Sequence, residues 1–291
     1  MNFFKKKSKP GGAQPAIDRH WNNDLVSDRG KRISEICKAK DFLTDWHKRW
    51  AGEIIDPVRF HRKQWEFTYI LQSLWERNCI GEGKQGLVFA VGTEKLPSLL
   101  ATYGCRIVAT DIHPEKGLEK GWDHGNQLCF GVEELNTAGI CPNDIFFERV
   151  SYRPVDMNDI PSDLRNFDFT WSSCSFEHLG SIEKGAAFLR NQMECLKPGG
   201  WAVHTTEYNL SSNDETLEED NTVIFRQRDI EKIVEELRAA GHFVENLDLS
   251  IGGLKEDFQV DIHPYNETPH VKLQIAKYVA TSIGLIIQKK A

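Results

Sequence analysis

The sequence lacks paired cysteines, long apolar runs and an excess of positive charge. Its seven cysteines are scattered without a Cys-x-x-Cys pair, which favours a reducing compartment over a disulfide framework, so we expect a cytoplasmic protein. No stretch approaches the ~18 consecutive apolar residues of a membrane-spanning helix, and the N-terminus has no apolar h-region. The formal net charge of −7 provides no global positive field for nucleic acid or anionic lipid. We therefore expect neither a nucleic-acid partner nor a membrane span.

An internal repeat and a complete G-x-G-x-x-G motif are also missing. With 291 residues, of which 40% are hydrophobic, the chain is long enough for one elaborated domain or two small ones. Residues 1–29 are polar and weakly periodic, which predicts a mobile arm. Residues 30–80 contain two helical patterns, at 33–50 and 61–75, and these predict a helical cap before a sheet domain at 81–291.

Aromatic residues recur at helix-like spacings in the predicted cap. Two interpretations stay open for them, namely the lining of a substrate or adenine pocket and ordinary core packing. The residues concerned are Trp46, Trp50, Trp65, Phe67, Tyr69 and Trp75.

The stretch GLVFAVGTEKLPSLLATYGCRIVATDIHP predicts a strand, a tight turn, a helix, a second strand and then a carboxylate. The apolar run at 87–91 is typical of a parallel strand buried on both faces, and Gly92 follows it at the turn. A helix is expected at 95–103 and a strand at 106–112. Asp111 stands nineteen positions after Gly92, about where a doubly wound fold places the acid that accepts hydrogen bonds from ribose hydroxyls.

Two further strands are predicted to end at the same edge of the sheet. FERVSYRPVDMNDIP, at 147–161, indicates a third strand, and FDFTWSS, at 167–173, indicates a fourth. The carboxyl ends of parallel strands are where open α/β sheets hold ligands. The residues that follow these strands are Asp156, Met157, Glu177 and His178.

The second half of the chain completes an α/β sheet. An amphipathic helix at 182–196 leads to the LKPGG turn and a fifth strand at 201–206, and another helix is expected at 228–240. Strands at 243–250 and 281–288 are expected to pair antiparallel at the sheet edge. The predicted fold is therefore a Rossmann-like, doubly wound, seven-stranded sheet, mostly parallel with an antiparallel edge strand, plus the N-terminal helical cap.

At these residues the chain resembles the class I S-adenosylmethionine-dependent methyltransferases. The resemblance extends from Gly86 to the C-terminus and is carried, in order, by VFAVGTE with TDIHPE, VDMNDIP, FDFTWSSCSFEHLG and LKPGGWAVHTTEYN. The LKPGG turn before a strand is especially typical of that family. HTTEYNLSSNDETLEEDNTVIFRQRDIE is in addition similar to bacterial methyltransferases associated with polysaccharide and other glycan synthesis.

The resemblance implies S-adenosyl-L-methionine as cofactor and a set of residues around it. Gly92, Glu94 and Asp111 are expected near its methionine and ribose parts, Asp156 and Met157 near its adenine, and Ser172, Ser173 and Cys174 beneath its sulfonium. Thr93 and Ile112 are also expected to bind the cofactor. The chain departs from the family at its first motif, because Val88, Ala90 and Glu94 occupy positions that are commonly acidic, glycine and glycine. Two roles stay open for Glu94, which either faces the amino group of the cofactor or caps the helix that follows.

Methyl transfer to an oxygen needs little chemistry from the protein beyond orientation and a base. A hydroxyl is a poor nucleophile while protonated, so a His or a carboxylate near the methyl group is expected. His178 is the first candidate base, and Glu177 is expected to orient it or to bind the acceptor. The alternative is that both residues satisfy loop backbone groups or cap the next helix. His204 and Glu207 are reserve candidates.

The segment at 252–278 is too long for a plain hairpin loop, so we expect it to cover the active site and help select the substrate. It contains a possible ligand cluster, Asp261, His263, Glu267 and His270, whose spacing fixes no coordination geometry. We therefore expect no metal.

Three function classes remain open from the sequence. The first, and the preferred one, is an S-adenosylmethionine-dependent methyltransferase, most simply an O-methyltransferase acting on a sugar, a glycan or another small-molecule hydroxyl. A nicotinamide-dependent enzyme is the second, although it leaves the LKPGG turn unexplained. The third is a non-catalytic, methyltransferase-like binding module, which the glycine-poor first motif favours. The sequence identifies neither the acceptor nor the oligomeric state.

Overall fold

The computed structural model describes residues 30–119, 121, 127–219, 221–266 and 268–291, so the arm expected at 1–29 lies outside the described residues. The chain separates into two units, Met1–Lys31 and Arg32–Ala291. The fold described here is that of the second unit.

The core of this unit is a sheet whose five central strands run parallel, in the order β6-β5-β2-β3-β4. A long strand, β13, joins the edge of β6 antiparallel. β2 and β5 are buried along almost their whole length, as expected for parallel strands covered on both faces. These strands are β2 (Gln85–Phe89), β3 (Arg106–Asp111), β4 (Val150–Pro154), β5 (Phe167–Ser173), β6 (Leu196–Asn209) and β13 (Tyr278–Gln288). The mixed, mostly parallel α/β sheet is as predicted.

The sheet is larger than the seven strands predicted, because eleven strands of the described residues belong to it. β1 (Ser34–Ile36) pairs antiparallel with β13, so the helix predicted at 33–50 is wrong at its start. The strand predicted at 243–250 is split into β9 (Phe243–Val244) and β10 (Leu247–Asp248). β9 pairs with β13, whereas β10 pairs with β1, which occupies the position beside β13 from Ile283 to Gly284.

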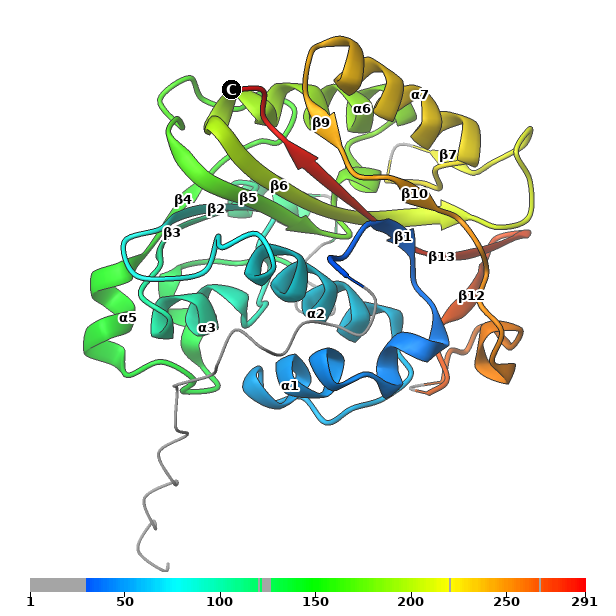
Figure 1. Ribbon diagram of the computed structural model, residues 1–291, viewed down its shortest axis with the longest axis horizontal. Helices are drawn as coiled ribbons and strands as arrows, with labels where there is room; N and C mark the ends of the chain where they lie inside the picture. The colour runs from blue at the N-terminus through cyan, green and yellow to red at the C-terminus, as the bar shows by residue number, and fades with distance from the viewer. Residues whose placement is uncertain (1–29, 120, 122–126, 220, 267) are drawn as a thin grey trace, which may run out of the picture. The chain divides into compact units, whose positions relative to one another are not determined.

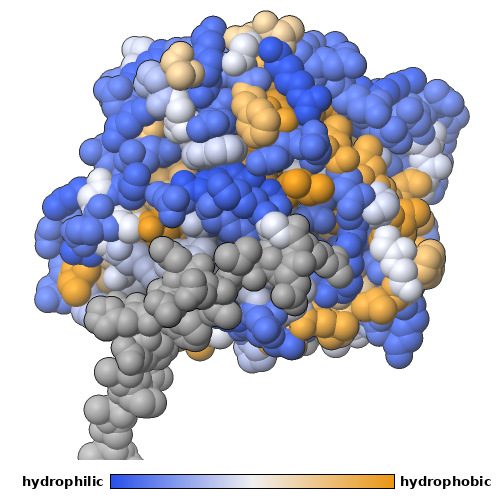
Figure 2. All heavy atoms as spheres, in the orientation of Figure 1, coloured by the Kyte–Doolittle hydropathy of each residue, from blue (hydrophilic) through white to orange (hydrophobic). Residues whose placement is uncertain are grey.

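The segment predicted to cover the substrate adds two further strands, β11 (Val260–Asp261) and β12 (Lys272–Ile275). β12 pairs antiparallel with β13, so this segment extends the sheet rather than forming a free loop. Large apolar side chains are exposed between β10 and β12, and Figure 2 shows apolar surface over that part of the molecule. They are Ile251, Phe258, Val260, Ile262 and Tyr265. A separate pair, β7 (Glu218–Glu219) and β8 (Thr222–Val223), forms a small hairpin.

Helices cover both faces of the sheet, as Figure 1 shows. One face carries α1 (Asp45–Glu53), α2 (Arg62–Trp75), α3 (Leu96–Thr102) and α5 (Asn143–Arg149), and the other carries α6 (Ile182–Asn191) and α7 (Gln227–Ala239). α4 (Pro114–Glu119) follows β3. Short 3-10 turns are η1 (Ala39–Leu43), η2 (Val132–Asn136), η3 (Phe176–His178), η4 (Gln192–Cys195) and η5 (Lys255–Asp257). None of the helices in the described part of the chain has the length and apolarity that crossing a bilayer requires.

The third strand is shorter than predicted. Residues 147–149 are the last turn of α5, and β4 begins only at Val150. Phe146 and Phe147 both belong to α5. Phe146 lies on its inner side and is fully buried, whereas Phe147 is exposed. A short apolar run does not distinguish such a helix from a strand, because both bury the same residues.

The aromatic residues of α1 and α2 mostly form core. Trp50, Trp65 and Tyr69 are completely buried in the apolar cluster between these helices and the sheet. Gly284 of β13 makes this packing possible, because a Cβ there would lie 2.1 Å from Cε1 of Tyr69. The core interpretation therefore holds for these three residues, whereas Phe67 faces the cavity described below.

Candidate functional site

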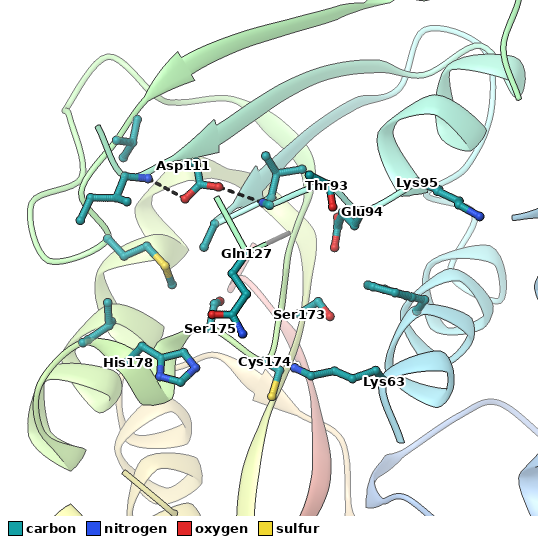
Figure 3. Close-up of a pocket in the computed structure, with 18 of the residues that line it drawn as sticks. Lys63, Thr93, Glu94, Lys95, Asp111, Gln127, Ser173, Cys174, Ser175 and His178 are labelled. Carbon is teal, nitrogen blue, oxygen red and sulfur yellow. Dashed lines mark hydrogen bonds between the residues drawn. The ribbon is translucent and has the colours of Figure 1, made fainter. Parts of the chain in front are cut away.

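A cavity of about 780 Å³ lies at the carboxyl ends of the central parallel strands. Figure 3 shows its polar lining, which comes from the loops after β2, β3 and β5 and from α2. This is the edge at which open parallel sheets bind ligands, because the strand order reverses between β2 and β5. A volume of this size is ordinary for a site that holds a cofactor together with a small substrate.

The turn after β2 is held in a left-handed conformation at two positions. Gly92 has φ of 51°, which glycine adopts without a Cβ penalty. Ala90 has φ of 49°, where an alanine costs roughly 1–2 kcal/mol. Both residues line the cavity. Ala90 thus adopts a backbone conformation that glycine takes more readily, at the expense of local strain.

Asp111 holds this turn against the end of β3. Its Oδ2 accepts hydrogen bonds from the backbone N–H of Gly92 at 2.9 Å and of Cys129 at 3.2 Å, and its Oδ1 accepts one from Ile112 at 2.7 Å. Burial raises the pKa of this carboxyl to about 6, although the three hydrogen bonds oppose the rise. The carboxylate therefore organises three segments of the cavity wall, while its contact with a ribose stays a prediction.

Glu94 points to the strand β5 rather than to the helix that follows it. Its Oε1 accepts a hydrogen bond of 2.6 Å from the indole N–H of Trp171, and α3 has no side-chain cap at Lys95. Burial raises the pKa of Glu94 to about 8, and the nearby carboxylates of Glu66 and Asp111 raise it further. The carboxyl group lines the cavity. The role as a helix cap is therefore not observed.

The loops after β3 and β4 form the neighbouring wall. Ile112, Asp156 and Met157 line the cavity, while the adenine contact expected of Asp156 and Met157 stays a prediction. Asp156 lies 3.7 Å from Nζ of Lys116 on α4 and accepts a hydrogen bond from the N–H of Asn158. An apolar floor with a carboxylate at its rim suits a planar heterocycle with an adjacent polar edge.

The end of β5 contributes two of the three residues predicted there. Ser173 and Cys174 line the cavity, and Cys174 has φ of 48°, another strained position at the site. Ser172 does not reach the cavity. It is completely buried and its hydroxyl lies 2.8 Å from Nδ1 of His204 on β6. Successive strand residues point to opposite faces, so a run of three could not share one wall.

His178, in η3, lines the cavity with 33% of its side chain exposed. Its Nδ1 lies 2.6 Å from the carbonyl oxygen of Asn221. A carbonyl oxygen only accepts, so Nδ1 carries the proton of the neutral ring and Nε2 carries the lone pair. This tautomer is the one that a base working through Nε2 requires.

Glu177 does not line the cavity, in contrast to His178. Its carboxylate is completely buried, with Oε2 accepting a hydrogen bond of 2.9 Å from Thr206 and Oε1 lying 4.0 Å from Nε2 of His178. Burial raises the pKa of Glu177, and the Glu207 carboxylate raises it further while His178 lowers it. Glu177 is thus placed behind His178, close enough to interact with a protonated imidazole ring.

A buried ion-pair network lies beneath the site. Arg62 of α2 donates to Glu207 of β6 and lies 3.3 Å from Glu66 and 3.4 Å from Sγ of Cys174. Ligand atoms of Cys174, Glu177 and Glu207 lie within 4.8 Å of one another, the one such potential metal-binding group among the described residues. The guanidinium of Arg62 already supplies a positive charge to this group. Glu207 and His204, the reserve candidates, are buried and do not line the cavity.

The residues of the possible ligand cluster at 252–278 do not form a metal site in the described part of that segment. Asp261 accepts a hydrogen bond from Nδ1 of His270 at 2.6 Å and two more from Asn266, and Glu267 lies outside the described residues. The ring of His270 stacks on that of His61, just before α2, at 4.6 Å. None of the cavity-lining residues comes from 252–278, so its role as a substrate cover stays a prediction.

One wall of the cavity comes from α2 and from the segment that joins α1 to α2, and pocket lining was among the expectations only for its Phe67. Sequence reasoning missed the other residues of this wall, which are Ile54, Asp56, Arg59 and Lys63. The polar residues around the start of α2 gave no signal by themselves, because charged residues at a helix start are normally solvated. Their position beside the sheet edge depends on how α2 packs across β13 and β6, which local periodicity does not reveal.

Residues 87–204 match the family model described as "Methyltransferase domain". The match begins in β2 and ends in β6, so it contains the turn at Gly92, Asp111, Asp156 and His178. The search of curated proteins found no match.

Solved structures with a similar arrangement include an S-adenosylmethionine-dependent methyltransferase from Clostridium acetobutylicum ATCC 824, at 14% identity and a TM-score of 0.45, covering 87% of this chain and 99% of that chain. One from Mesorhizobium loti has 12% identity and a TM-score of 0.45, covering 72% of this chain and 93% of that one. The [4+2]-cyclase SpnF has 18% identity and a TM-score of 0.45, covering 74% of this chain and 76% of that one. Likenesses this distant carry no assignment of reaction or substrate to this chain.

Proposed function

We propose that this chain, whose residues 87–204 match the methyltransferase domain family, is an S-adenosyl-L-methionine-dependent enzyme that methylates a hydroxyl oxygen of a sugar, a glycan end or another small molecule. The observation that carries the choice of oxygen is the distance of 2.6 Å between Nδ1 of His178 and the carbonyl oxygen of Asn221. A cavity-lining imidazole with its proton on Nδ1 has Nε2 ready to receive the proton of a hydroxyl group.

The residues that line the cavity fit the cofactor chemically. The left-handed turn at Gly92 brings backbone rather than side chains to the wall, and Asp111 and Asp156 provide carboxylates beside it. Among the residues expected at the cofactor, those that line the cavity are Gly92, Thr93, Glu94, Asp111, Ile112, Asp156, Met157, Ser173 and Cys174. When bound, the cofactor supplies an electrophilic methyl group on a sulfonium.

The residues of the chain then have three tasks. They hold the acceptor oxygen in line with the methyl carbon, exclude water, and remove the hydroxyl proton. The oxygen–carbon bond forms as the sulfur–carbon bond breaks, the sulfur keeps the electron pair, and the hydroxyl proton goes to Nε2 of His178. The Glu177 carboxyl, 4.0 Å from that nitrogen, stabilises the resulting imidazolium.

The proposal includes the cellular compartment of the protein and the class of its acceptor. All seven cysteines are free and buried, which supports a reducing compartment such as the cytoplasm. The net charge of −7 supports a small-molecule or saccharide acceptor rather than a nucleic acid. The strand-forming segment at 252–278 is proposed to cover the acceptor side, supported by the stacking of His270 on His61 at the start of α2.

Two measurements test the function. Saturating S-adenosylhomocysteine is expected to raise the melting temperature of the full chain, because a ligand of the native state stabilises by mass action. Incubation with methyl-labelled cofactor and a panel of hydroxyl acceptors, including free sugars and nucleotide sugars, is expected to yield a methyl ether. Absence of any thermal shift would favour the non-catalytic module, and a shift with NADH alone would favour the nicotinamide enzyme.

A further inference from the structure

The end of the cavity beside α2 contains a buried carboxyl group and an accessible ammonium group. Glu94, in the turn after β2, and Lys63, on α2, both line the cavity, and Figure 3 shows both side chains directed into it. Burial raises the pKa of Glu94 to about 8, whereas the Trp171 hydrogen bond and the Lys63 ammonium lower it. The two groups are therefore close enough to interact, and one ligand can contact both.

Glu94 has one oxygen available to such a ligand. Its Oε1 accepts the hydrogen bond of 2.6 Å from the indole N–H of Trp171, whereas its Oε2 accepts none within the described residues. The residue is only 7% exposed and lines the cavity, so the donor that satisfies Oε2 comes from the contents of the cavity. A cationic donor also favours the ionised form of the carboxyl group.

Lys63 is the cation at this end whose N–H groups have no acceptor within the described residues. Arg59 donates to the carboxylate of Asp56, and Nζ of Lys95 donates to a backbone carbonyl oxygen at 3.0 Å. Figure 3 shows Lys95 extending away from Glu94 and Lys63 extending from α2 toward the cavity. The side chain of Lys63 is 39% exposed, so its ammonium group is accessible to a ligand.

The carboxylate nearest to Lys63 along α2 is already satisfied by other groups. Oε2 of Glu66 lies 3.7 Å from Nζ of Lys63, and it accepts hydrogen bonds from Ser173 at 3.2 Å and Thr205 at 3.3 Å. Arg62 donates to the other oxygen of Glu66 at 3.3 Å. The opposite charge of Glu66 therefore positions the Lys63 ammonium, while the N–H groups of that ammonium stay available.

The methionine end of S-adenosylmethionine carries the two complementary groups, an ammonium and a carboxylate on the same carbon. The ammonium only donates, so it needs an acceptor such as Oε2 of Glu94. The carboxylate only accepts, so it needs a donor such as Nζ of Lys63, and a pair of opposite charges makes the hydrogen bond stronger. Because the adenosine part carries no charge, these two contacts distinguish the ends of the cofactor.

We propose that Lys63 binds the carboxylate of the cofactor's methionine end and that Glu94 binds its ammonium group. The inference rests on the proposed function, because it needs S-adenosylmethionine as the ligand. It adds a cofactor-binding residue from α2, outside the methyltransferase domain match at 87–204. The helix α2 then completes the cofactor site, and the protein discriminates against adenosine derivatives that lack the amino acid end.

The test compares three ligands by calorimetry on the full chain. S-adenosylmethionine has both charged groups, decarboxylated S-adenosylmethionine keeps the amine but lacks the carboxylate, and methylthioadenosine lacks both. The proteins are the wild type, Lys63→Met, Lys63→Arg and Glu94→Gln. Lys48→Met is the matched control, because Lys48 lies on α1 with 54% of its side chain exposed and does not line the cavity.

We expect the wild type and Lys48→Met to bind S-adenosylmethionine about 10- to 100-fold more tightly than the decarboxylated ligand, the range for a hydrogen bond to a charged group. Lys63→Met is expected to lose this preference without weaker binding of the decarboxylated ligand, and Lys63→Arg to keep part of it. Glu94→Gln is expected to weaken both ligands that carry an amine and to leave methylthioadenosine binding unchanged.

Three results would overturn the inference. They are a wild type with no preference for the carboxylate, a Lys63→Met protein that keeps the wild-type preference, and a Glu94→Gln protein that weakens methylthioadenosine as much as the other ligands. The last result would indicate a structural role for Glu94 instead of a contact with the ammonium. If none of the three ligands binds the wild type, the proposed function itself fails, so its failure is distinguishable from a wrong assignment of Lys63 and Glu94.

Discussion

The indole N–H of Trp171 donates a hydrogen bond of 2.6 Å to the carboxyl group of Glu94, and this contact joins the middle of β5 to the turn after β2. Both residues are buried, and Glu94 faces the carboxylates of Glu66 and Asp111 as well as the ammonium of Lys63. Burial among these groups raises the pKa of Glu94 from its usual value of 4.5 to about 8. The turn after β2, where we propose that the cofactor binds, is therefore sensitive to pH.

The first prediction concerns the pH dependence of stability. Between pH of about 4.5 and 8 the folded protein keeps the Glu94 proton that the unfolded chain releases, so the free energy of unfolding falls as the pH rises. The contribution is complete below the unfolded pKa and is lost above the folded one. Glu94→Gln keeps an acceptor for Trp171 and removes the titration, so we expect a flatter profile in urea unfolding across this range.

The control for this experiment is Glu235→Gln, because Glu235 is exposed on α7. Its profile is expected to follow the wild type. Equal slopes for the wild type and Glu94→Gln would show that Glu94 does not hold its proton in the folded protein.

The second prediction concerns Asp111. Replacing it with alanine leaves the N–H groups of Gly92, Ile112 and Cys129 without their acceptor, so the turn loses its organisation. We expect binding of S-adenosylhomocysteine to weaken by about 1–3 kcal/mol, measured by calorimetry. Asp144→Ala, at an exposed position of α5, is the control. An unchanged Kd in a folded Asp111→Ala protein would exclude Asp111 from the cofactor site.

The third prediction concerns His178. With the acceptor that the product assay identifies, His178→Ala is expected to lower kcat by about 10²–10⁴, the usual contribution of a general base. The Kd of S-adenosylhomocysteine is expected to change little, because the proposed cofactor contacts lie in the loops after β2, β3 and β4. His242→Ala is the control, since His242 follows α7 and contacts Lys290 rather than the cavity. Unchanged turnover in His178→Ala would remove this residue from the mechanism.

The fourth prediction concerns the packing of α2 on β13. In Gly284→Ala the new Cβ meets the fully buried ring of Tyr69, whose hydroxyl donates to the carbonyl oxygen of Ile33 at 2.6 Å. Overpacking of this kind is expected to destabilise the fold by about 1–3 kcal/mol or more in urea unfolding. Gly253→Ala is the matched control, because nothing lies within 4 Å of the position that a Cβ would take there. Equal stability of the two variants would contradict the close packing at Gly284.

Some parts of the fold were predictable because their signals are local. β2, β3 and β5 lie within about two residues of their predicted bounds, since each is a short run rich in β-branched, aromatic or other apolar residues. Gly92 and Asp111 were placed correctly beside each other by the spacing of a strand, a turn, a helix and a second strand. That spacing depends on helix and strand geometry, which the sequence carries directly.

Other parts depended on partners far away in the chain. The three residues of β1 form a strand because they pair with the edge of β13, which lies about 250 positions later in the chain. The residues at 34–36 carry no local pattern that predicts this pairing. Ser172 was assigned to the cavity with its two neighbours, but the alternation of β5 turns it toward His204. The choice of face was made by packing.

The sequence by itself determined the parallel α/β sheet, the turn at Gly92 and the order of strand ends that carry Asp111, Asp156 and His178, because apolar runs and turn residues act over a few positions. Only the tertiary structure decided that the basic side of α2 faces those strand ends, that Glu94 bonds to Trp171 and that Glu177 stays behind His178. Each of these depends on which side of a helix or strand packs against the rest of the protein. That packing involves residues that are distant in sequence and close in space.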